Sequence, residues 1–321
     1  MDKELIRICE QFVENRKRVE RAFPLSAGQI HCMCSLLLGL DDCDADLAAL
    51  RRAKRYLRTH TAPVSTFRGF GMSAIAVKLS VRENAEEWLG IAKENYKTLK
   101  KAGFPGTDYL CLAAMLLIKC HDRAEEIASK AMEIYRSMSH THRVLTANED
   151  VCFAILYAMH TDTALSLKNA EIAFETLENA FGAINPVQMS SQVIGMMGED
   201  PSLAAQRTEW LYRELRENGI RAKTHTELPV LAFLAASGKA DKAAVQNILD
   251  IMRYLKQKKG FSALTIGRYH RLLFACCIEA LYELNRSREA EKYRLHRDTL
   301  QCVMLLTVLL AVVQNIAATG V

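Results

Sequence analysis

The strongest constraint on this chain is a motif that returns about every 39 residues. In each copy an amphipathic helix ends in a large residue, a Leu or Met follows three positions later, and a short turn leads to a more apolar helix. These Leu and Met positions are Leu57, Leu99, Met138, Leu177, Leu215 and Leu255, with spacings of 42, 39, 39, 38 and 40 residues. A fixed period of this length is typical of tandem helix-pair repeats.

The composition agrees with a helical protein. Only 6 prolines and 15 glycines interrupt 321 residues, and 50% of the chain is hydrophobic, which is enough apolar surface for a packed core. No segment alternates apolar and polar residues in the manner of a strand. These features exclude a disordered chain and favour an all-α fold.

The turns between the expected helices support the same pairing. Gly103, Gly219 and Gly260 follow helix ends where a left-handed residue is favoured. The second helix of each pair is expected at 67–79, 108–118, 149–159, 187–197, 227–236 and 264–281, and an N-terminal pair at 3–23 and 29–38. We therefore predict an α-solenoid-like tandem array of about seven helix pairs. A plain globular helical domain built from the same pairs is the alternative.

The C-terminal segment differs from the repeats. Residues 299–321 carry no charge and are almost continuously apolar from 302 to 313. We therefore divide the chain into a helical-repeat domain, 1–298, and a hydrophobic C-terminal helix, 299–321. A bilayer span needs about 20 apolar residues, and the polar Gln314 and Asn315 interrupt this one. Docking on the repeats or formation of a homodimer is favoured over a membrane anchor, which stays open.

The cysteines and the N-terminal sequence predict a cytoplasmic location. The chain has 10 cysteines, most of them in apolar helical runs, and it begins with a charged amphipathic helix rather than a secretory signal. Its net charge of +5, from 42 basic and 37 acidic residues, does not require a polyanionic partner. We expect a reducing compartment, with membrane association as the alternative.

Two short motifs resemble ligand sites but lack the context that such sites need. Residues 69–74 fit the glycine pattern of dinucleotide-binding proteins, but no buried strand precedes them. The acidic run 41–46 lacks the Gly and the Glu of a calcium loop and is expected to cap the next helix instead. Hydrolase, NTPase and zinc-protease signatures are missing as well. No catalytic residue and no cofactor is predicted.

The histidine and cysteines of the helix expected at 29–38 do not have the geometry of a zinc site. Cys32 and Cys34 follow His31, but two residues spaced by two on a helix point about 200° apart. His140 and His142 are expected in a solvated turn. No metal ligand is predicted.

Basic residues cluster on a helix expected around residue 55. Arg51, Arg55 and Arg58 share one side of it, with Arg52 nearby. Such a stripe suits phosphates, but aromatic residues for base stacking are not interleaved with it. A solvated outer face is the favoured interpretation, and nucleic acid is not the expected partner.

A second basic set lies at the start of expected second helices, which usually line the concave face of such arrays. Its members are Arg68, Arg268, His270 and Arg271. We predict that these residues bind a peptide or protein partner. Hydrogen bonds to helix-end carbonyls are the equally weighted structural alternative.

Several segments of the chain form a recognisable set: Phe67-Arg68-Gly69, LKKAGF, YLCLAAMLL, KKGFSALTIGRYHRLLFA and the uncharged C-terminus. Together they resemble domain-of-unknown-function family 4003, a family of bacterial proteins from Gram-positive species. The resemblance covers nearly the whole chain, which is richer in cysteine and lacks the long Ala-rich ending of the family. It implies a helical, cytoplasmic protein and no particular activity.

Taken together, the repeat and the missing catalytic motifs predict a non-enzymatic binding module for a peptide or protein. The first alternative is an enzyme that uses a His/Arg pocket on an anionic small molecule. The second is an adaptor held at a membrane by the C-terminal helix.

Overall fold

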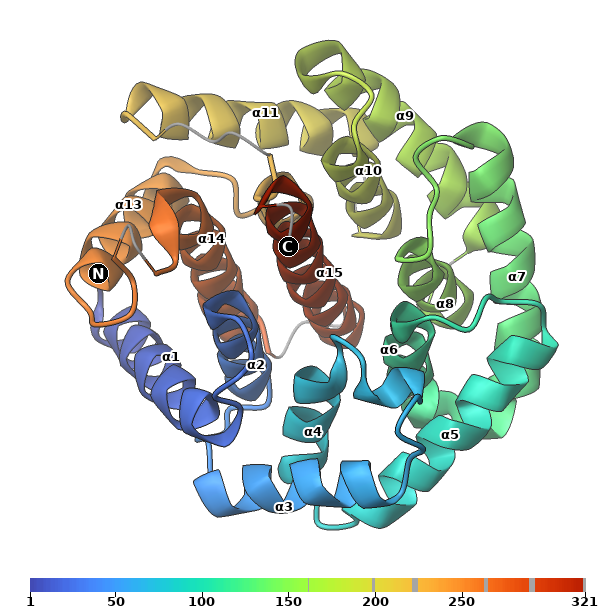
Figure 1. The fold of residues 1–321 in the computed structure, drawn as a ribbon. Coiled ribbons are helices and arrows are strands. Elements are labelled where there is room, and N and C mark those ends of the chain that lie inside the picture. The colour runs from blue at the N-terminus through green and yellow to red at the C-terminus, as the bar shows by residue number, and fades with distance from the viewer. Residues whose placement is uncertain (161, 198–199, 221–224, 263–264, 289–291, 320–321) are drawn as a thin grey trace. The chain divides into compact units, whose positions relative to one another are not determined.

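The computed structural model describes residues 1–321 except 161, 198–199, 221–224, 263–264, 289–291 and 320–321. In the described part of the chain every regular element is a helix, so the all-α prediction is confirmed (Figure 1). The α-helices are α1 (Lys3–Ala22), α2 (Gly28–Leu40), α3 (Leu47–Thr59), α4 (Met72–Ser80), α5 (Ala85–Lys101), α6 (Asp108–Leu116), α7 (Ala124–Thr141), α8 (Asp150–His160), α9 (Thr163–Phe181), α10 (Asn185–Met197), α11 (Pro201–Glu217), α12 (Leu228–Ala236), α13 (Lys242–Lys256), α14 (Gly267–Arg286) and α15 (Tyr293–Thr319). Two short 3-10 helices are also present. The first, η1 (Thr66–Arg68), precedes α4, and the second, η2 (Leu117–Arg123), follows α6.

The predicted second helices agree well with the structure. The segments 149–159, 187–197 and 227–236 correspond to α8, α10 and α12 with small shifts at their ends. The segments 67–79 and 108–118 were each expected as one helix, but the first divides into η1 and α4 and the second into α6 and η2. Gly69 and Gly71 separate η1 from α4, and glycine favours such a break.

The turn glycines have the left-handed backbone expected of them, with φ of 110° at Gly103, 78° at Gly219 and 90° at Gly260. Beyond two of these turns the chain bonds back to the repeated leucine: the amide of Phe104 donates to the Leu99 carbonyl, and that of Ile220 to the Leu215 carbonyl. Both leucines are buried. The period therefore marks the positions where a core side chain and a helix end coincide.

The chain forms two compact units, each discontinuous in sequence. Unit 1 contains residues 1–20, 25–44 and 164–321, and unit 2 contains residues 21–24 and 45–163. In unit 2, α3 packs on α4, α5 on α6, α7 on α8, and α6 also on α8. In unit 1, α11 packs on α12, α13 on α14, and α12 on both α10 and α14. Helix pairs are therefore present in both units, while their regular arrangement as seven repeats stays a prediction.

Helix α15 forms the centre of unit 1, where it packs against α2, α10, α12 and α14 (Figure 1). It begins before the C-terminal helix expected from residue 299, and residues 320–321 lie outside the described part. Residues Tyr293–Val313 are long and apolar enough to cross a membrane, but 72% of their most apolar window is buried inside the structure. In the structure this helix therefore docks on other helices of unit 1. The dimer and the membrane anchor stay predictions.

The acidic loop after α2 is held by basic residues that are distant in sequence. Arg297 of α15 forms an ion pair with Asp41, and Arg288 and Arg7 lie 3.2 and 3.6 Å from Asp42. Farther along, Asp46 accepts hydrogen bonds from the amides of the first turn of α3, at 2.7 and 3.2 Å. The capping role expected for this run is confirmed at Asp46.

Helices α9 and α10 approach so closely at Gly195 that no side chain fits. A Cβ atom at this position would lie 2.6 Å from the Ser166 carbonyl oxygen and 2.7 Å from the Ala170 nitrogen. Backbone atoms cannot move aside as a flexible side chain can. Gly90 of α5, in contrast, has open space around it.

We predict opposite effects for alanine at these two glycines. Gly195→Ala is expected to lower the free energy of unfolding by about 1–3 kcal/mol, because the overpacked helices must separate. Gly90→Ala is expected to raise it by about 0.5–1 kcal/mol, because alanine is the better helix former at an open position. Urea unfolding followed by circular dichroism measures both. A neutral Gly195→Ala variant would contradict the close approach of α9 and α10.

Unit 1 also buries two carboxyl groups that carry no cationic partner close enough for an ion pair in the described residues. Burial raises the pKa of Glu227 to about 7 and the pKa of Glu279 to about 8. Glu279 accepts one hydrogen bond from Asn247, at 3.1 Å. Both carboxyls are therefore protonated in the folded protein under mildly acidic conditions.

These raised pKa values predict that stability falls as the pH rises. The unfolded carboxyls ionise near pH 4.5, whereas the folded ones stay neutral until about pH 7 and 8, so stability is lost across that interval. Glu279→Gln keeps the hydrogen bond to Asn247 and removes the ionisation. Its melting temperature is expected to exceed that of the unmodified protein at pH 9 and to match it near pH 5. An equal difference at both pH values would contradict this assignment.

Candidate functional site

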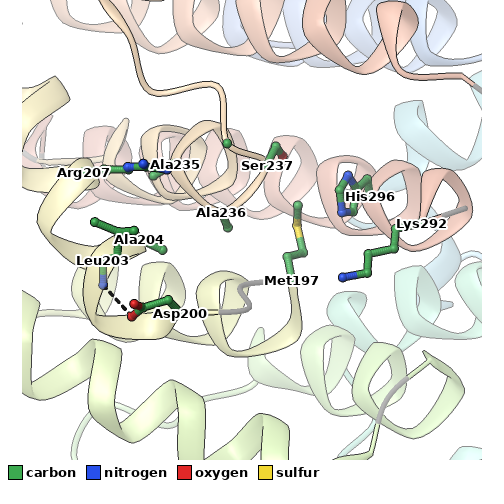
Figure 2. A pocket seen from close by; sticks show the side chains of 11 residues that line it. Met197, Asp200, Leu203, Ala204, Arg207, Ala235, Ala236, Ser237, Lys292 and His296 are labelled. Carbon is green, nitrogen blue, oxygen red and sulfur yellow. Dashed lines mark hydrogen bonds between the residues drawn. The ribbon is translucent and has the colours of Figure 1, made fainter. Parts of the chain in front are cut away.

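The described part of unit 1 contains a pocket of about 400 Å³ between the end of α10, the first turns of α11, the end of α12 and the start of α15. Figure 2 shows it from close by. Its lining residues are Met197, Asp200, Leu203, Ala204, Arg207, Ala235, Ala236, Ser237, Gly238, Lys292 and His296.

Helix α11 supplies one wall. Asp200 caps the helix by accepting a hydrogen bond from the Leu203 amide at 2.9 Å, and Pro201 follows where no amide hydrogen is needed. Arg207 stands two turns along from Asp200, on the same side of the helix. The buried Ala204 between them leaves room for the cavity.

The end of α12 supplies the second wall. Gly238, with φ of 71°, closes the helix, and the Lys239 amide donates to the Leu234 carbonyl at 2.8 Å. The hydroxyl of Ser237 donates to the Phe233 carbonyl at 2.7 Å. This hydroxyl is therefore engaged with its own helix rather than directed at a reaction partner.

The third wall comes from Lys292, in the turn just before α15, and from His296, in the first turn of α15, whose amide donates to the Lys292 carbonyl at 3.0 Å. Figure 2 shows both on one side of the pocket, with Asp200 and Arg207 on the other. Burial and the neighbouring Lys292 lower the pKa of His296, which is thus neutral at neutral pH. Its Nε2 atom is buried and has no hydrogen-bond partner among the described residues.

The pocket combines an apolar floor with a charged rim. Met197 and Ala235 are buried, whereas Arg207, Lys292 and Asp200 are exposed. The lining holds two cations and one carboxylate, which caps α11 through the Leu203 amide, so the cations are in excess by one. A group with negative charge is the complementary occupant.

Sequence reasoning missed this site because its residues come from four separate segments. The dipeptide Asp200-Pro201 is typical of a helix start, and Lys292 and His296 lie just before the apolar C-terminal segment, but neither pattern indicates a pocket. No local motif links them to Arg207. Only the packing of α15 against α10 and α12 brings the segments together.

The residues predicted to bind a partner contact backbone carbonyls, and none of them lines this pocket. Arg68, in unit 2, donates to Thr61 Oγ1 at 3.0 Å and to the carbonyls of Arg58 and Thr61. These bonds complete the C-terminal end of α3. They are the contacts that the structural alternative expected.

The other three predicted residues lie in unit 1. Arg268 donates to the Gly219 carbonyl, Arg271 to the Phe261 carbonyl at 2.5 Å, and Nδ1 of His270 lies 2.9 Å from the Ile266 carbonyl. Arg271 is largely buried, and burial together with Arg268 lowers its pKa. None of these three residues lines the pocket. Their partner-binding role stays a prediction.

Metal and dinucleotide chemistry finds no support in the described ranges. They contain no cluster of three or more His, Cys, Asp or Glu side chains that suits a metal ion, and none of the ten cysteines is part of a disulfide. Burial raises the pKa of the Cys32 thiol to about 12, so it is protonated. Gly69 lies against the Asp108 carboxylate, which accepts the Phe70 amide at 2.7 Å, as expected of a glycine-assisted helix entry.

Comparison with known proteins yields one match. No curated protein and no solved structure matches the chain. One family model, described as "Protein of unknown function (DUF4003)", matches residues 15–315. This range includes every residue of the pocket. The chain therefore belongs to the DUF4003 family, as the resemblance of its repeat segments indicated.

Proposed function

We propose that the protein is a non-enzymatic helical binding module, and that the pocket of unit 1 holds an anionic group of a peptide or protein partner. The observation that carries this proposal is that Arg207 of α11 and Lys292, in the turn before α15, line the same pocket around an apolar floor. Asp200, the carboxylate of the lining, is already committed to capping α11.

The size of the pocket suits part of a larger partner. About 400 Å³ lies at the lower end of ligand sites, which usually measure about 300–1,000 Å³. Such a volume admits one acidic or phosphorylated side chain together with part of a neighbouring residue, with Met197 and Ala235 against the aliphatic part. Arg207 supplies a planar fork for two oxygens, and Lys292 a point charge.

The neutral His296 adds recognition without charge. Because its buried Nε2 lacks a partner in the described residues, a bound oxygen donor or acceptor would satisfy it. Its ring packs edge-on against Phe233, with centroids 6.2 Å apart, which holds the imidazole in place. The partner surface expected around Arg68, Arg268, His270 and Arg271 is a separate prediction.

The proposal predicts charge-dependent peptide binding. On an array of seven-residue peptides that carry a central phosphoserine, Asp, Glu or Ser, the full chain is expected to be retained by anionic peptides only. Arg207→Gln combined with Lys292→Gln is expected to weaken retention at least tenfold, because each charged hydrogen bond is worth about 1.5–3 kcal/mol.

The control matched in charge is Lys256→Gln combined with Lys259→Gln. Both lysines are exposed and neither lines the pocket. This variant lowers the net charge and is expected to bind as the unmodified protein does. Equal retention of the variant changed at Arg207 and Lys292, or equal binding to the Ser peptides, would contradict the proposal.

A second candidate function, an enzyme acting on an anionic small molecule, is favoured by His296. A neutral imidazole in a pocket with two cations is one requirement of a general base. Steady hydrolysis of p-nitrophenyl phosphate or p-nitrophenyl acetate that is abolished in His296→Gln would support the enzyme. We expect no such turnover, because the Ser237 hydroxyl bonds the Phe233 carbonyl instead of a base.

A further inference from the structure

The outer face of α3 in unit 2 carries an excess of positive charge that the proposed function does not use. Arg51, Arg52, Arg55 and Arg58 are all exposed. Within the described ranges their guanidinium groups make no ion pair and no hydrogen bond. The opposite face of the helix, at Leu50 and Leu57, is buried, so the arginines are fixed on the outer side.

The positive charges of the four arginines repel one another and that of the neighbouring Lys54. Lys54 donates to the Ala22 carbonyl at 2.9 Å and lies over the Phe23 ring. Burial, followed by the charges of Arg58 and Arg51, lowers its pKa. Such clustering of like charge lowers stability unless an anion compensates it.

Two of these arginines line a groove of about 610 Å³ between α3, the end of α4 and the start of α5. Arg52 and Arg55 come from α3, and Arg82 from the connection between α4 and α5. Arg82 is positioned by the Trp88 ring, whose centroid lies 4.3 Å from its guanidinium carbon. Three guanidinium groups therefore border one groove.

The remaining walls offer apolar and hydroxyl contacts. Leu79 and Ala53 are buried at the base, and Tyr56 is half-buried beside them, with its ring stacked on His60 at 3.9 Å. Thr59 and Ser80 contribute hydroxyl groups. This combination suits a molecule with several phosphate oxygens and an apolar or aromatic part.

We propose that this groove binds a small molecule that carries two or more linked phosphates, such as a nucleoside polyphosphate. Each guanidinium group can donate two hydrogen bonds to one phosphate. A ligand with a single carboxylate has too few oxygens to bind all three arginines in this way, whereas linked phosphates have enough. The exposed Glu83 and Glu86 also border the groove, which opposes a long polyanion that would have to pass over them.

Calorimetric titration of the full chain at low and moderate salt tests the proposal, with ATP and inorganic pyrophosphate as probes. Both are expected to bind with one-to-one stoichiometry. Arg52→Gln combined with Arg55→Gln is expected to raise the Kd for ATP at least tenfold. Because both residues are exposed and their charges repel their neighbours, the variant is expected to keep or slightly raise its melting temperature without ligand.

The matched control is Arg51→Gln combined with Arg58→Gln, which removes the same charge from the same helix but from positions outside the groove. It is expected to change the Kd by less than about twofold at moderate salt, where long-range effects are screened. Equal weakening by both double variants would overturn the groove assignment in favour of diffuse attraction.

Two further outcomes would also overturn it. One is no heat with either probe, and the other is tighter binding of a 20-nucleotide single-stranded DNA than of ATP, which would indicate a nucleic-acid face. The inference does not depend on the pocket of unit 1. Arg207→Gln combined with Lys292→Gln is expected to leave the ATP titration unchanged, so the two proposals fail separately.

Discussion

Burial of α15 is the interaction on which unit 1 depends. The helix follows all the others in sequence, and it contacts α2 near the start of the chain as well as α10, α12 and α14. Its middle residues, including Leu300, Val303 and Leu306, are fully buried, so a segment apolar enough for a bilayer forms a protein core here. An apolar helix can be buried by lipid or by other helices. In this structure the other helices of unit 1 bury it.

The docking of α15 brings residues from distant parts of the chain into contact. The ion pair between Arg297 and Asp41 joins positions 256 apart in sequence, and neither side chain is freely exposed. Removing one member of such a pair leaves a partly buried charge, which is the costly case. The start of α15, which carries Arg297, also carries His296, and Lys292 lies in the turn just before it, so the docking that builds the core also positions one wall of the pocket.

The local features of the fold were predictable from the sequence, whereas the site was not. Gly103, Gly219 and Gly260 marked helix ends because left-handed backbone favours glycine, and the repeated leucines marked the core because amphipathic helices bury one face. For Arg68 and Arg268 the sequence favoured partner binding and bonds to helix-end carbonyls equally. Which carbonyls they contact depends on how the loops fold back. The contact of Arg207 and Lys292 with one pocket depends on tertiary packing, which no local pattern encodes.

The central claim, that the pocket of unit 1 receives an anionic group, is tested most directly at His296. Its ring signal in two-dimensional NMR, assigned by comparison with His296→Gln, reports on the pocket without altering Arg207 or Lys292. Titration with a phosphoserine peptide that the protein binds is expected to shift this signal saturably, with the same Kd as binding, while the serine peptide leaves it in place. Binding of the phosphoserine peptide with an unmoved His296 signal would contradict the account.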